Sequence, residues 1–215
     1  LKWLCETTEN SEVRCLDEDA GNQMIEEIKS AKNSRDSLGG VVELIVRGVP
    51  VGLGSYSQWS KRLDASLAAA LMSIPSVKGV EFGLGFQGGG VRGSSAHDEI
   101  SYESGTAPAK KGFHRATNRA GGIEGGISNG EDIIARVAAK PISTLNRPLK
   151  TVDVVSKKSA EAMVERTDHC VVPALAVVTE AMAAVTLADA FMEKFGGDNF
   201  DELSRNYRAW LDTAY

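Results

Sequence analysis

The segment from residue 121 to residue 144 carries the residue types best suited to bind an anion. It opens GGIEGGISNG, and five glycines in ten positions let the backbone adopt positive φ and let a ligand approach the amides. Successive N–H groups in such a loop form an anion-binding nest. Downstream, Arg136 and Lys140 fall on the same face of an expected strand, and a proline then leads to the hydroxyls of Ser143 and Thr144. These residues predict a phosphate clamp, although a glycine-rich hairpin with solvated charges fits about equally well.

A second group of polar residues lies in the segment ERTDHCVVP. Arg166 could grip a phosphate or carboxylate, and Asp168 could act as a base or orient one. A loop ion pair, or an Asp that caps the next helix, is the stronger interpretation of these residues alone. His169 is equally compatible with a structural role, and Arg115 and Arg119 either meet an anionic ligand or face water.

Two familiar signatures occur in a sequence context that argues against them. Residues 83–88 match GxGxxG, but a dinucleotide-binding fold needs a helix to open there, and no helix is expected for the following GGVRGSS. Residues 126–130 match GxSxG, but a nucleophile elbow must enter a helix, whereas this segment enters an alternating strand. The three histidines offer no persuasive triad.

The elements that must position these groups alternate between helix and strand. Leucines spaced four apart predict a helix over residues 58–74, with Trp59, Leu63, Leu67, Leu71 and Ile74 on one stripe. Further helices are expected over residues 18–32, 157–164, 170–192 and 200–215, and strands over residues 41–50, 77–86, 98–103, 131–141 and 151–155. Residues 104–112 read as a mobile loop. The pattern predicts an α/β or α+β domain with largely antiparallel sheets packed on long helices.

Composition limits the classes of protein that fit. The 215 residues are 42% hydrophobic and 25% charged, typical of a globular domain, and the net charge of −5 argues against a nucleic-acid or acidic-membrane partner. Three cysteines without CxxC spacing indicate free thiols in a reducing, cytoplasmic compartment. The chain shows no signal peptide, and without an initiator Met residue 1 need not be the biological start.

Residues 170–192 are apolar and long enough to cross a bilayer. Glu180 and Asp189 lie on nearly opposite faces of that helix, and each would cost roughly 2.5–3.5 kcal/mol at mid-bilayer. We therefore expect a buried core helix and no membrane partner.

Four stretches together resemble the chorismate synthase family. They are DSLGGVVELIVRGVPVGLG, LDASLAAALMSIPSVKGVEFGLGF, TNRAGGIEGGISNGEDI with AAKPIST, and ERTDHCVVPALAVVTEAMAAVTLADA. The resemblance spans roughly residues 13–190, and four long motifs in order are far more specific than a lone glycine pattern. It implies an α+β fold, a β-α-β sandwich with long helices between largely antiparallel sheets, and a homotetramer. Residues 1–215 would be the C-terminal portion of one such domain.

The resemblance also implies a reaction and its residues. The family is a lyase of aromatic amino-acid biosynthesis in the shikimate pathway that eliminates phosphate from 5-enolpyruvylshikimate 3-phosphate to give chorismate, using reduced FMN. Matched motif by motif, the implied flavin contacts are Pro75, Ser76, Gly125, Lys140, Pro141, Ile142, Ser143, Thr144 and Arg166. Asp168 would lie near the flavin and assist proton movement. Whether a partner reductase or an intrinsic NADPH activity reduces the flavin stays open.

The chain departs from the family pattern around Arg166. Many members read Arg-His-Asp-Pro-Cys and then Pro-Arg-Ala, where this sequence has Thr167, His169 and Ala174-Leu175. The family carries its two catalytic histidines and several substrate-binding arginines in an N-terminal portion, and His97, His114 and His169 match neither histidine motif. As given, the fragment is expected to bind flavin poorly and to turn over nothing. The alternatives are an inert self-associating domain and a standalone FMN-binding module.

Overall fold

The computed structural model describes residues 2–103 and 112–213, so nearly all of the expected loop at residues 104–112 lies outside the described residues. The chain divides into two compact units. Unit 1 comprises Leu1–Val42 and Ala138–Val178, and unit 2 comprises Glu43–Val137 and Thr179–Tyr215.

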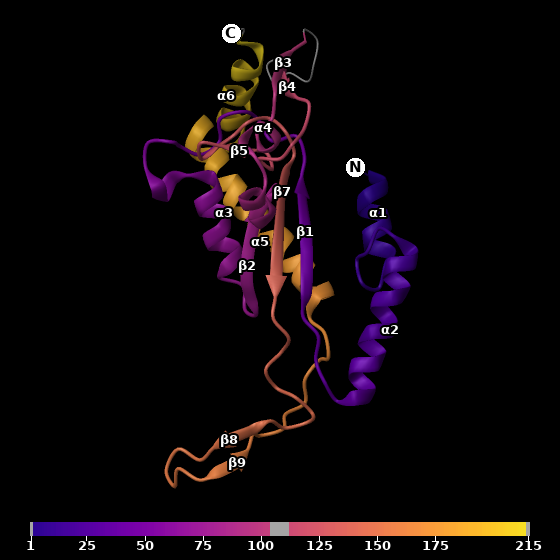
Figure 1. The fold of residues 1–215 in the computed structure, drawn as a ribbon. Coiled ribbons are helices and arrows are strands. Elements are labelled where there is room, and N and C mark those ends of the chain that lie inside the picture. Colours follow the sequence, from indigo (N-terminus) through magenta and orange to yellow (C-terminus); the bar gives the residue numbers. More distant parts are fainter. Residues whose placement is uncertain (1, 104–111, 214–215) are drawn as a thin grey trace. The chain divides into compact units, whose positions relative to one another are not determined.

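The largest sheet has three strands in the order β1-β7-β2, where β1 is Gly40–Val46, β7 is Ile133–Ala139 and β2 is Val77–Phe82 (Figure 1). The pairing of β7 with β2 is antiparallel, since Gly83 N donates to Ile134 O while Glu81 pairs with Arg136. Alternate residues of β7 from Ile133 to Ala139 are buried, as the sequence alternation predicts.

Helix α3 (Leu63–Met72) begins later than the sequence predicts. Leu63, Leu67 and Leu71 are buried on one stripe, which confirms the predicted spacing. Trp59, expected on the same stripe, is 79% exposed, so that part of the prediction is wrong. It lies in a separate 3-10 turn, η1 (Trp59–Lys61), because the extended backbone of Arg62 interrupts the helical path between the two elements.

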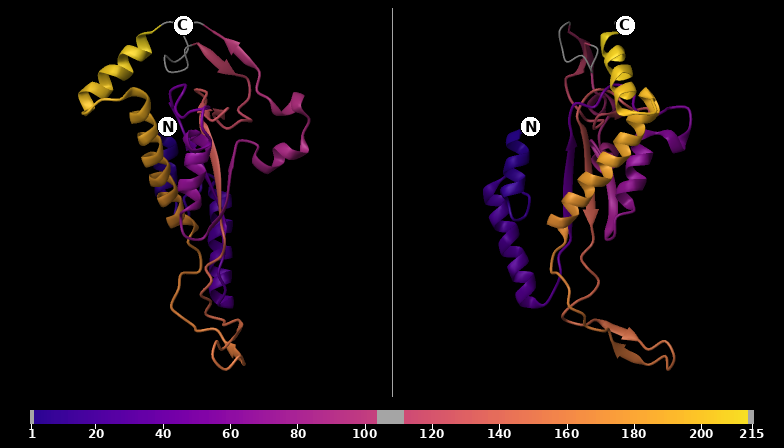
Figure 2. Two further views of the ribbon diagram at one scale, coloured as in Figure 1. Left: turned by 90° about the vertical axis from the view of Figure 1, so that its left-hand side faces the viewer. Right: turned by 180° about the vertical axis from the view of Figure 1, so that it is seen from behind.

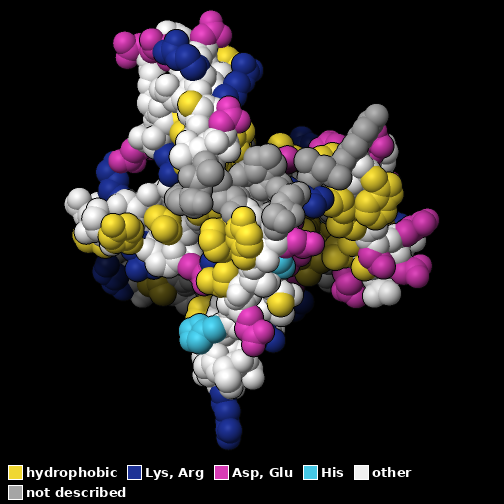
Figure 3. Space-filling view, turned by 90° about the horizontal axis from the view of Figure 1, so that it is seen from above, with side chains coloured by type: hydrophobic (Ala, Val, Ile, Leu, Met, Phe, Trp, Pro, Cys, Tyr) yellow, Lys and Arg dark blue, Asp and Glu magenta, His cyan; other side chains and the backbone are white. Residues whose placement is uncertain are grey.

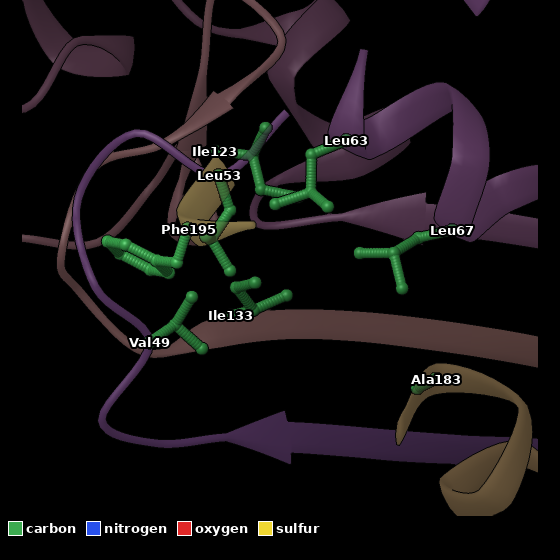
Figure 4. Close-up of a cluster of buried hydrophobic side chains, with 8 residues drawn as sticks. All are labelled: Val49, Leu53, Leu63, Leu67, Ile123, Ile133, Ala183 and Phe195. Carbon is green, nitrogen blue, oxygen red and sulfur yellow. The ribbon is translucent and has the colours of Figure 1, made fainter. Parts of the chain in front are cut away.

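The core of unit 2 forms where α3, β7, the strand residue Ile123 and the part of α5 (Val172–Phe195) from Ala183 to Phe195 meet the loop after β1 (Figure 4). Its buried side chains are Val49, Leu53, Leu63, Leu67, Ile123, Ile133, Ala183 and Phe195. Helix α6 (Phe200–Asp212) starts at an Asn199 cap, whose side chain accepts hydrogen bonds from the first turn. Its amphipathic face, as predicted, packs Tyr207 and Trp210 against Phe195. Figure 2 shows α6 following the C-terminal end of α5.

Helix α5 matches the predicted apolar span but not the predicted burial. By length and composition it could cross a membrane, yet only 17% of its most apolar window is buried within the chain. One stripe through Thr179 and Ala183 is buried, whereas Val185 and Met192 face outward. The expectation of a buried core helix is therefore wrong for this chain, because other elements cover only one side of α5. Hydrophobic side chains also reach the surface in separate patches on the face shown in Figure 3.

The middle of unit 2 consists of short elements. Hairpins join β3 (Ile100–Tyr102) to β4 (Phe113–Arg115) and β5 (Ile123–Glu124) to β6 (Ile127–Ser128), both antiparallel. The stretch after the GxGxxG match forms a 3-10 helix, η2 (Gly85–Gly90), and one helical turn, α4 (Gly93–Ala96). The expectation of no helix there is wrong in detail, although neither element has the length that a dinucleotide-binding helix requires.

Unit 1 contains α1 (Lys2–Asn10), α2 (Glu18–Ser34) and a hairpin of β8 (Lys150–Val152) and β9 (Ser159–Glu161). Asp17 caps α2 by accepting from Ala20 N. The predicted helix over residues 157–164 is wrong, because Lys157 adopts φ +57° in a tight turn and the following residues pair with β8 as a strand. Helices combined with antiparallel strand pairs place the chain in the predicted α+β class.

Candidate functional site

The segment after α2 is flanked on both sides by the chain segments that carry predicted site residues of unit 1. On one side Leu38 N donates to His169 O at 2.7 Å, and Leu38 forms a parallel bridge with Cys170. On the other side the Ser37 hydroxyl donates to Ile142 O at 2.8 Å. The segment Ser37–Leu38 therefore lies between Ile142 on one side and His169 and Cys170 on the other.

Gly39 allows this close approach. A Cβ at this position would lie 2.3 Å from Ala139 O, closer than real Cβ atoms approach, and 3.0 Å from Pro141 Cδ, a tight contact. No role for Ser37 or Gly39 was predicted from the sequence. The Gly39-Gly40 pair was the one feature of the sequence that could have indicated a close approach of the backbone here.

The charged side chains of this region are exposed. Lys140, Arg166 and Asp168 all face solvent. Within the described part of the chain, none of the three side chains has a hydrogen bond or an ion pair with another residue. Ser143 beside them is exposed as well. The loop ion pair considered for Arg166 and Asp168 is therefore not formed here, and two cations and a hydroxyl remain available to an anionic ligand.

His169 holds the flanking segment in place. Its Nδ1 lies 2.9 Å from Asp36 O. A carbonyl oxygen only accepts hydrogen bonds, so Nδ1 carries the proton in this contact. This geometry favours the structural interpretation of His169 over a catalytic one.

The glycine-rich loop of unit 2 uses its amides internally. Gly121 N donates to Asn118 O, Gly122 N to the Asn118 side chain, and Asn129 N back to Gly122 O. These amides are not aimed at a ligand, which favours the hairpin interpretation over an anion nest for this part of the loop. Gly125, with φ +59° at the hairpin turn, differs because nothing lies within 4 Å of a Cβ placed there.

The serine of the GxSxG match has a structural role. Ser128 is fully buried, its hydroxyl donates to Pro50 O at 2.6 Å, and its oxygen accepts from Leu53 N at 2.8 Å. Ser128 therefore fastens the hairpin to the loop after β1, as expected for a residue outside a nucleophile elbow.

Two arginines that the sequence offered to an anion are paired within unit 2. Arg136 Nε lies 2.8 Å from Glu81 Oε1, and its Nη2 donates to Gly83 O. Arg115 contacts Glu124 at 2.5 Å and donates to Asn129 O at 3.1 Å. Both therefore hold segments of unit 2 together, and the proposed partnership of Arg136 with Lys140 in a clamp finds no support.

The predicted flavin contacts of unit 2 lie at opposite ends of α3. Gly125 adjoins its N-terminus, where Leu63 N donates to Gly126 O, whereas Pro75 and Ser76 follow its C-terminus. Ten helical residues span about 15 Å, so these positions do not converge on one phosphate group within unit 2. The remaining predicted contacts, residues 140–144 and Arg166, belong to unit 1.

Asp98 is a buried carboxylate that the sequence analysis missed. It is 9% exposed and accepts hydrogen bonds from Thr117 Oγ1 at 2.5 Å and from the amides of Arg119 and Ala120, each at 2.9 Å. Burial acts to raise the pKa of Asp98, but these hydrogen bonds and the Arg119 charge lower the pKa below its ordinary value. Its partners lie about twenty residues away, beyond any local pattern.

The structure is that of an α+β protein whose unit 1 exposes two cations, Lys140 and Arg166. Comparison with known proteins makes this class specific. The family model described as chorismate synthase matches residues 2–192. The chain therefore belongs to the chorismate synthase family.

Relatives and a solved structure agree with this membership. The chain is 52% identical over 208 residues to a chorismate synthase of Geotalea daltonii, covering 96% of this chain and 53% of the relative. It is 56% identical over 202 residues to one from Desulforudis audaxviator, covering 94% and 50%. A crystal structure of chorismate synthase matches with a TM-score of 0.81 and 39% identity, over 99% of this chain and 54% of that one. The chain spans about half the length of these proteins.

Proposed function

We propose that this chain is the C-terminal portion of a chorismate synthase. The whole enzyme is a carbon–oxygen lyase that removes phosphate and a ring proton from 5-enolpyruvylshikimate 3-phosphate in a 1,4-elimination, giving chorismate with the help of reduced FMN. The observation that carries this proposal is the family match over residues 2–192. The exposed cations beside Ser37–Gly39 support it, because both the substrate and the cofactor carry phosphate.

The residues of unit 1 fit a phosphate-bearing cofactor. Lys140 and Arg166 are exposed cations without partners among the described residues, and Ser143 and Thr144 add hydroxyl donors. We assign them, with Pro141 and Ile142 between them in the chain, to the FMN site. Pro75, Ser76 and Gly125 complete the proposed set.

Reduced flavin supplies an electron-rich ring that favours expulsion of phosphate. The chain's own groups would act around it. Lys140 and Arg166 would hold the phosphate-bearing flavin, and basic side chains beside it would neutralise negative charge on the departing phosphate as its C–O bond breaks. Asp168, exposed on the adjacent segment, would assist removal of the ring proton.

The proposal includes an assembly and a location. The full enzyme would be a cytoplasmic homotetramer with a small-molecule substrate and with neither a nucleic-acid nor a membrane partner. A net charge of −5 and free cysteines at positions 5, 15 and 170 agree with this assignment. By itself the chain would bind FMN weakly and turn over little, because it spans half of its relatives and its predicted cofactor contacts do not all converge.

Titration of FMN and of substrate, followed by fluorescence and calorimetry, tests the assignment. We compare this chain with a version extended by the remaining segment of the Geotalea daltonii relative. In the extended protein we expect Lys140→Ala to weaken FMN binding about tenfold, the loss of one charge-assisted contact worth about 1.4 kcal/mol. Lys32→Ala, which removes an exposed lysine of α2, should leave binding unchanged.

The same titration separates the two other functions. An inert self-associating domain predicts no binding to either protein and no effect of Lys140→Ala. A standalone FMN-binding module predicts tight binding to the shorter chain. Either result contradicts the proposal.

A further inference from the structure

The turn between β5 and β6 carries two backbone amides that the fold leaves unpaired. Gly125 and Gly126 have φ +59° and +88°, and two positive values in succession are typical of a type I′ hairpin turn. Within the described residues, neither amide donates a hydrogen bond to another group. A Cβ at Gly125 would meet no atom within 4 Å, so a ligand can approach this part of the turn. The turn therefore offers two hydrogen-bond donors with open space beside them.

The Gly126 end of the turn is fixed against the start of α3. Gly126 O accepts a hydrogen bond from Leu63 N at 2.8 Å, and a Cβ at Gly126 would lie 2.6 Å from Arg62 Cγ. The turn cannot rotate at this end without breaking the hydrogen bond or displacing the arginine. The residue before the turn, Glu124, supplies the other attachment.

The Glu124 carboxylate is held by two side chains of unit 2. Its Oε2 lies 2.5 Å from Arg115 Nη2 and accepts a hydrogen bond from Asn129 Nδ2 at 2.8 Å. Arg115 and Asn129 also contact each other, since Arg115 Nη1 donates to Asn129 O at 3.1 Å. These three residues form a closed network, the Glu124 network, which joins β4, β5 and the segment after β6.

Burial strengthens the Glu124 network. The Arg115 side chain is 10% exposed and Asn129 is 7% exposed, so water competes little for their hydrogen bonds. Arg115 Nε is buried and has no partner in the described part of the chain, so the guanidinium is held through its two Nη atoms. Removing the charge of Glu124 would leave a buried cation with a weaker partner, which is costly. The network therefore depends on the Glu124 carboxylate.

We propose that Glu124 is a positioning residue for the proposed FMN site. Anchored by Arg115 and Asn129, it fixes the Gly125-Gly126 turn so that both amides can donate to an oxygen acceptor of the cofactor. A turn that is already fixed in the free protein loses less conformational entropy when the ligand binds. The inference rests on the proposed function, because that proposal assigns Gly125 to the FMN site.

FMN binding to Glu124→Gln in the extended protein tests this role, because two explanations predict opposite signs. Positioning predicts that the dissociation constant rises about tenfold, through the loss of a charge-assisted contact. A carboxylate that only repels an anionic cofactor predicts tighter binding in the same variant. Glu43→Gln, which removes an exposed carboxylate of β1, is the matched control and should leave the constant unchanged. Fluorescence titration under native conditions measures these constants, and an unchanged or lower constant in Glu124→Gln would overturn the proposal.

A double-mutant cycle tests whether Arg115 acts through Glu124. Arg115→Lys keeps the charge, but an ammonium group cannot reproduce the fork that bonds Glu124 and Asn129 O together. We expect this variant also to bind FMN about tenfold more weakly, and E124Q/R115K to bind about as well as either single variant. Losses that multiply in the double variant would show that the two residues act independently and would overturn the Glu124 network as the positioning device.

Hydrogen exchange in the cofactor-free extended protein distinguishes a failed inference from a failed function. In Glu124→Gln, exchange across residues 123–129 should be about tenfold faster than in wild type, while exchange in α3 stays the same. Unchanged exchange would overturn the positioning role whether or not FMN binds. Faster exchange in a protein whose wild type binds no FMN would overturn the proposed function, and with it the role of Glu124 in that site.

Discussion

The cation-bearing segments of unit 1 and the glycine-rich loop of unit 2 use similar residues in opposite ways. Around the loop, Arg115 of β4 and Arg136 of β7 are paired with Glu124 and Glu81, and the loop amides named above donate inside the protein. In unit 1, Lys140 and Arg166 stay exposed beside a backbone held by Ser37 and Gly39. The comparison teaches that cations paired within the fold are already used, so that exposed and unpaired cations are the better candidates for a ligand.

Replacing a glycine gives the largest expected difference between the two regions. Gly39→Ala places a Cβ 2.3 Å from Ala139 O and should lower the free energy of unfolding by about 3 kcal/mol. Gly125→Ala meets no atom within 4 Å and should cost about 1 kcal/mol, from positive φ alone. Urea unfolding followed by circular dichroism measures both. Equal costs would show that the close approach at Gly39 is not a constraint.

The buried carboxylate of unit 2 gives the next largest effect. Asp98→Asn should lower the free energy of unfolding by about 2 kcal/mol at pH 7, because the uncharged amide accepts the three hydrogen bonds less well. The folded pKa of Asp98 lies below the unfolded value near 3.8, so its stabilisation is present above that pH and is lost as the pH falls through the folded pKa. The gap between wild type and variant should therefore shrink below about pH 4. A gap independent of pH in denaturant titrations would contradict this role.

The exposed cation should have the smallest effect on stability. Lys140→Ala should change the free energy of unfolding by less than about 0.5 kcal/mol, since its side chain has no partner among the described residues. Arg136→Ala should cost about 2 kcal/mol, because it leaves Glu81 and Gly83 O without their partner. Thermal unfolding of the two variants side by side sharpens the comparison. A large loss of stability in the Lys140→Ala variant would show that this lysine has a structural role.

Elements governed by local spacing were predictable from the sequence. The leucine stripe of α3 and the alternation of β7 follow from periods of 3.6 and 2, and both were confirmed. The predicted burial of Trp59 was wrong because the extended backbone of Arg62 breaks the helix. The predicted helix over residues 157–164 was wrong because a turn and strand pairing prevailed over helix propensity. The predicted burial of α5 was wrong because the hydrophobic periodicity and composition of a helix do not determine how much of its surface other elements cover.

The charged residues of the candidate site could be predicted from the sequence, but the contacts that hold their segments in place could not. Lys140 and Arg166 could be selected by residue type and neighbouring motif. The contact of Ser37 with Ile142 spans 105 positions, and Gly39 approaches a strand equally far along the chain, so no sequence window contains either. Asp98 was missed for the same reason. The assignments of Pro75, Ser76 and Gly125 to flavin binding stay predictions.

Anaerobic conversion of 5-enolpyruvylshikimate 3-phosphate to chorismate with chemically reduced FMN tests the central claim most directly. The assay compares this chain with the version extended by the remaining segment of the Geotalea daltonii relative, both checked for folding by circular dichroism. We predict turnover by the extended protein, a severe loss in its Asp168→Asn variant, and little or no turnover by this chain alone. A folded extended protein that releases no phosphate and forms no chorismate would contradict the account.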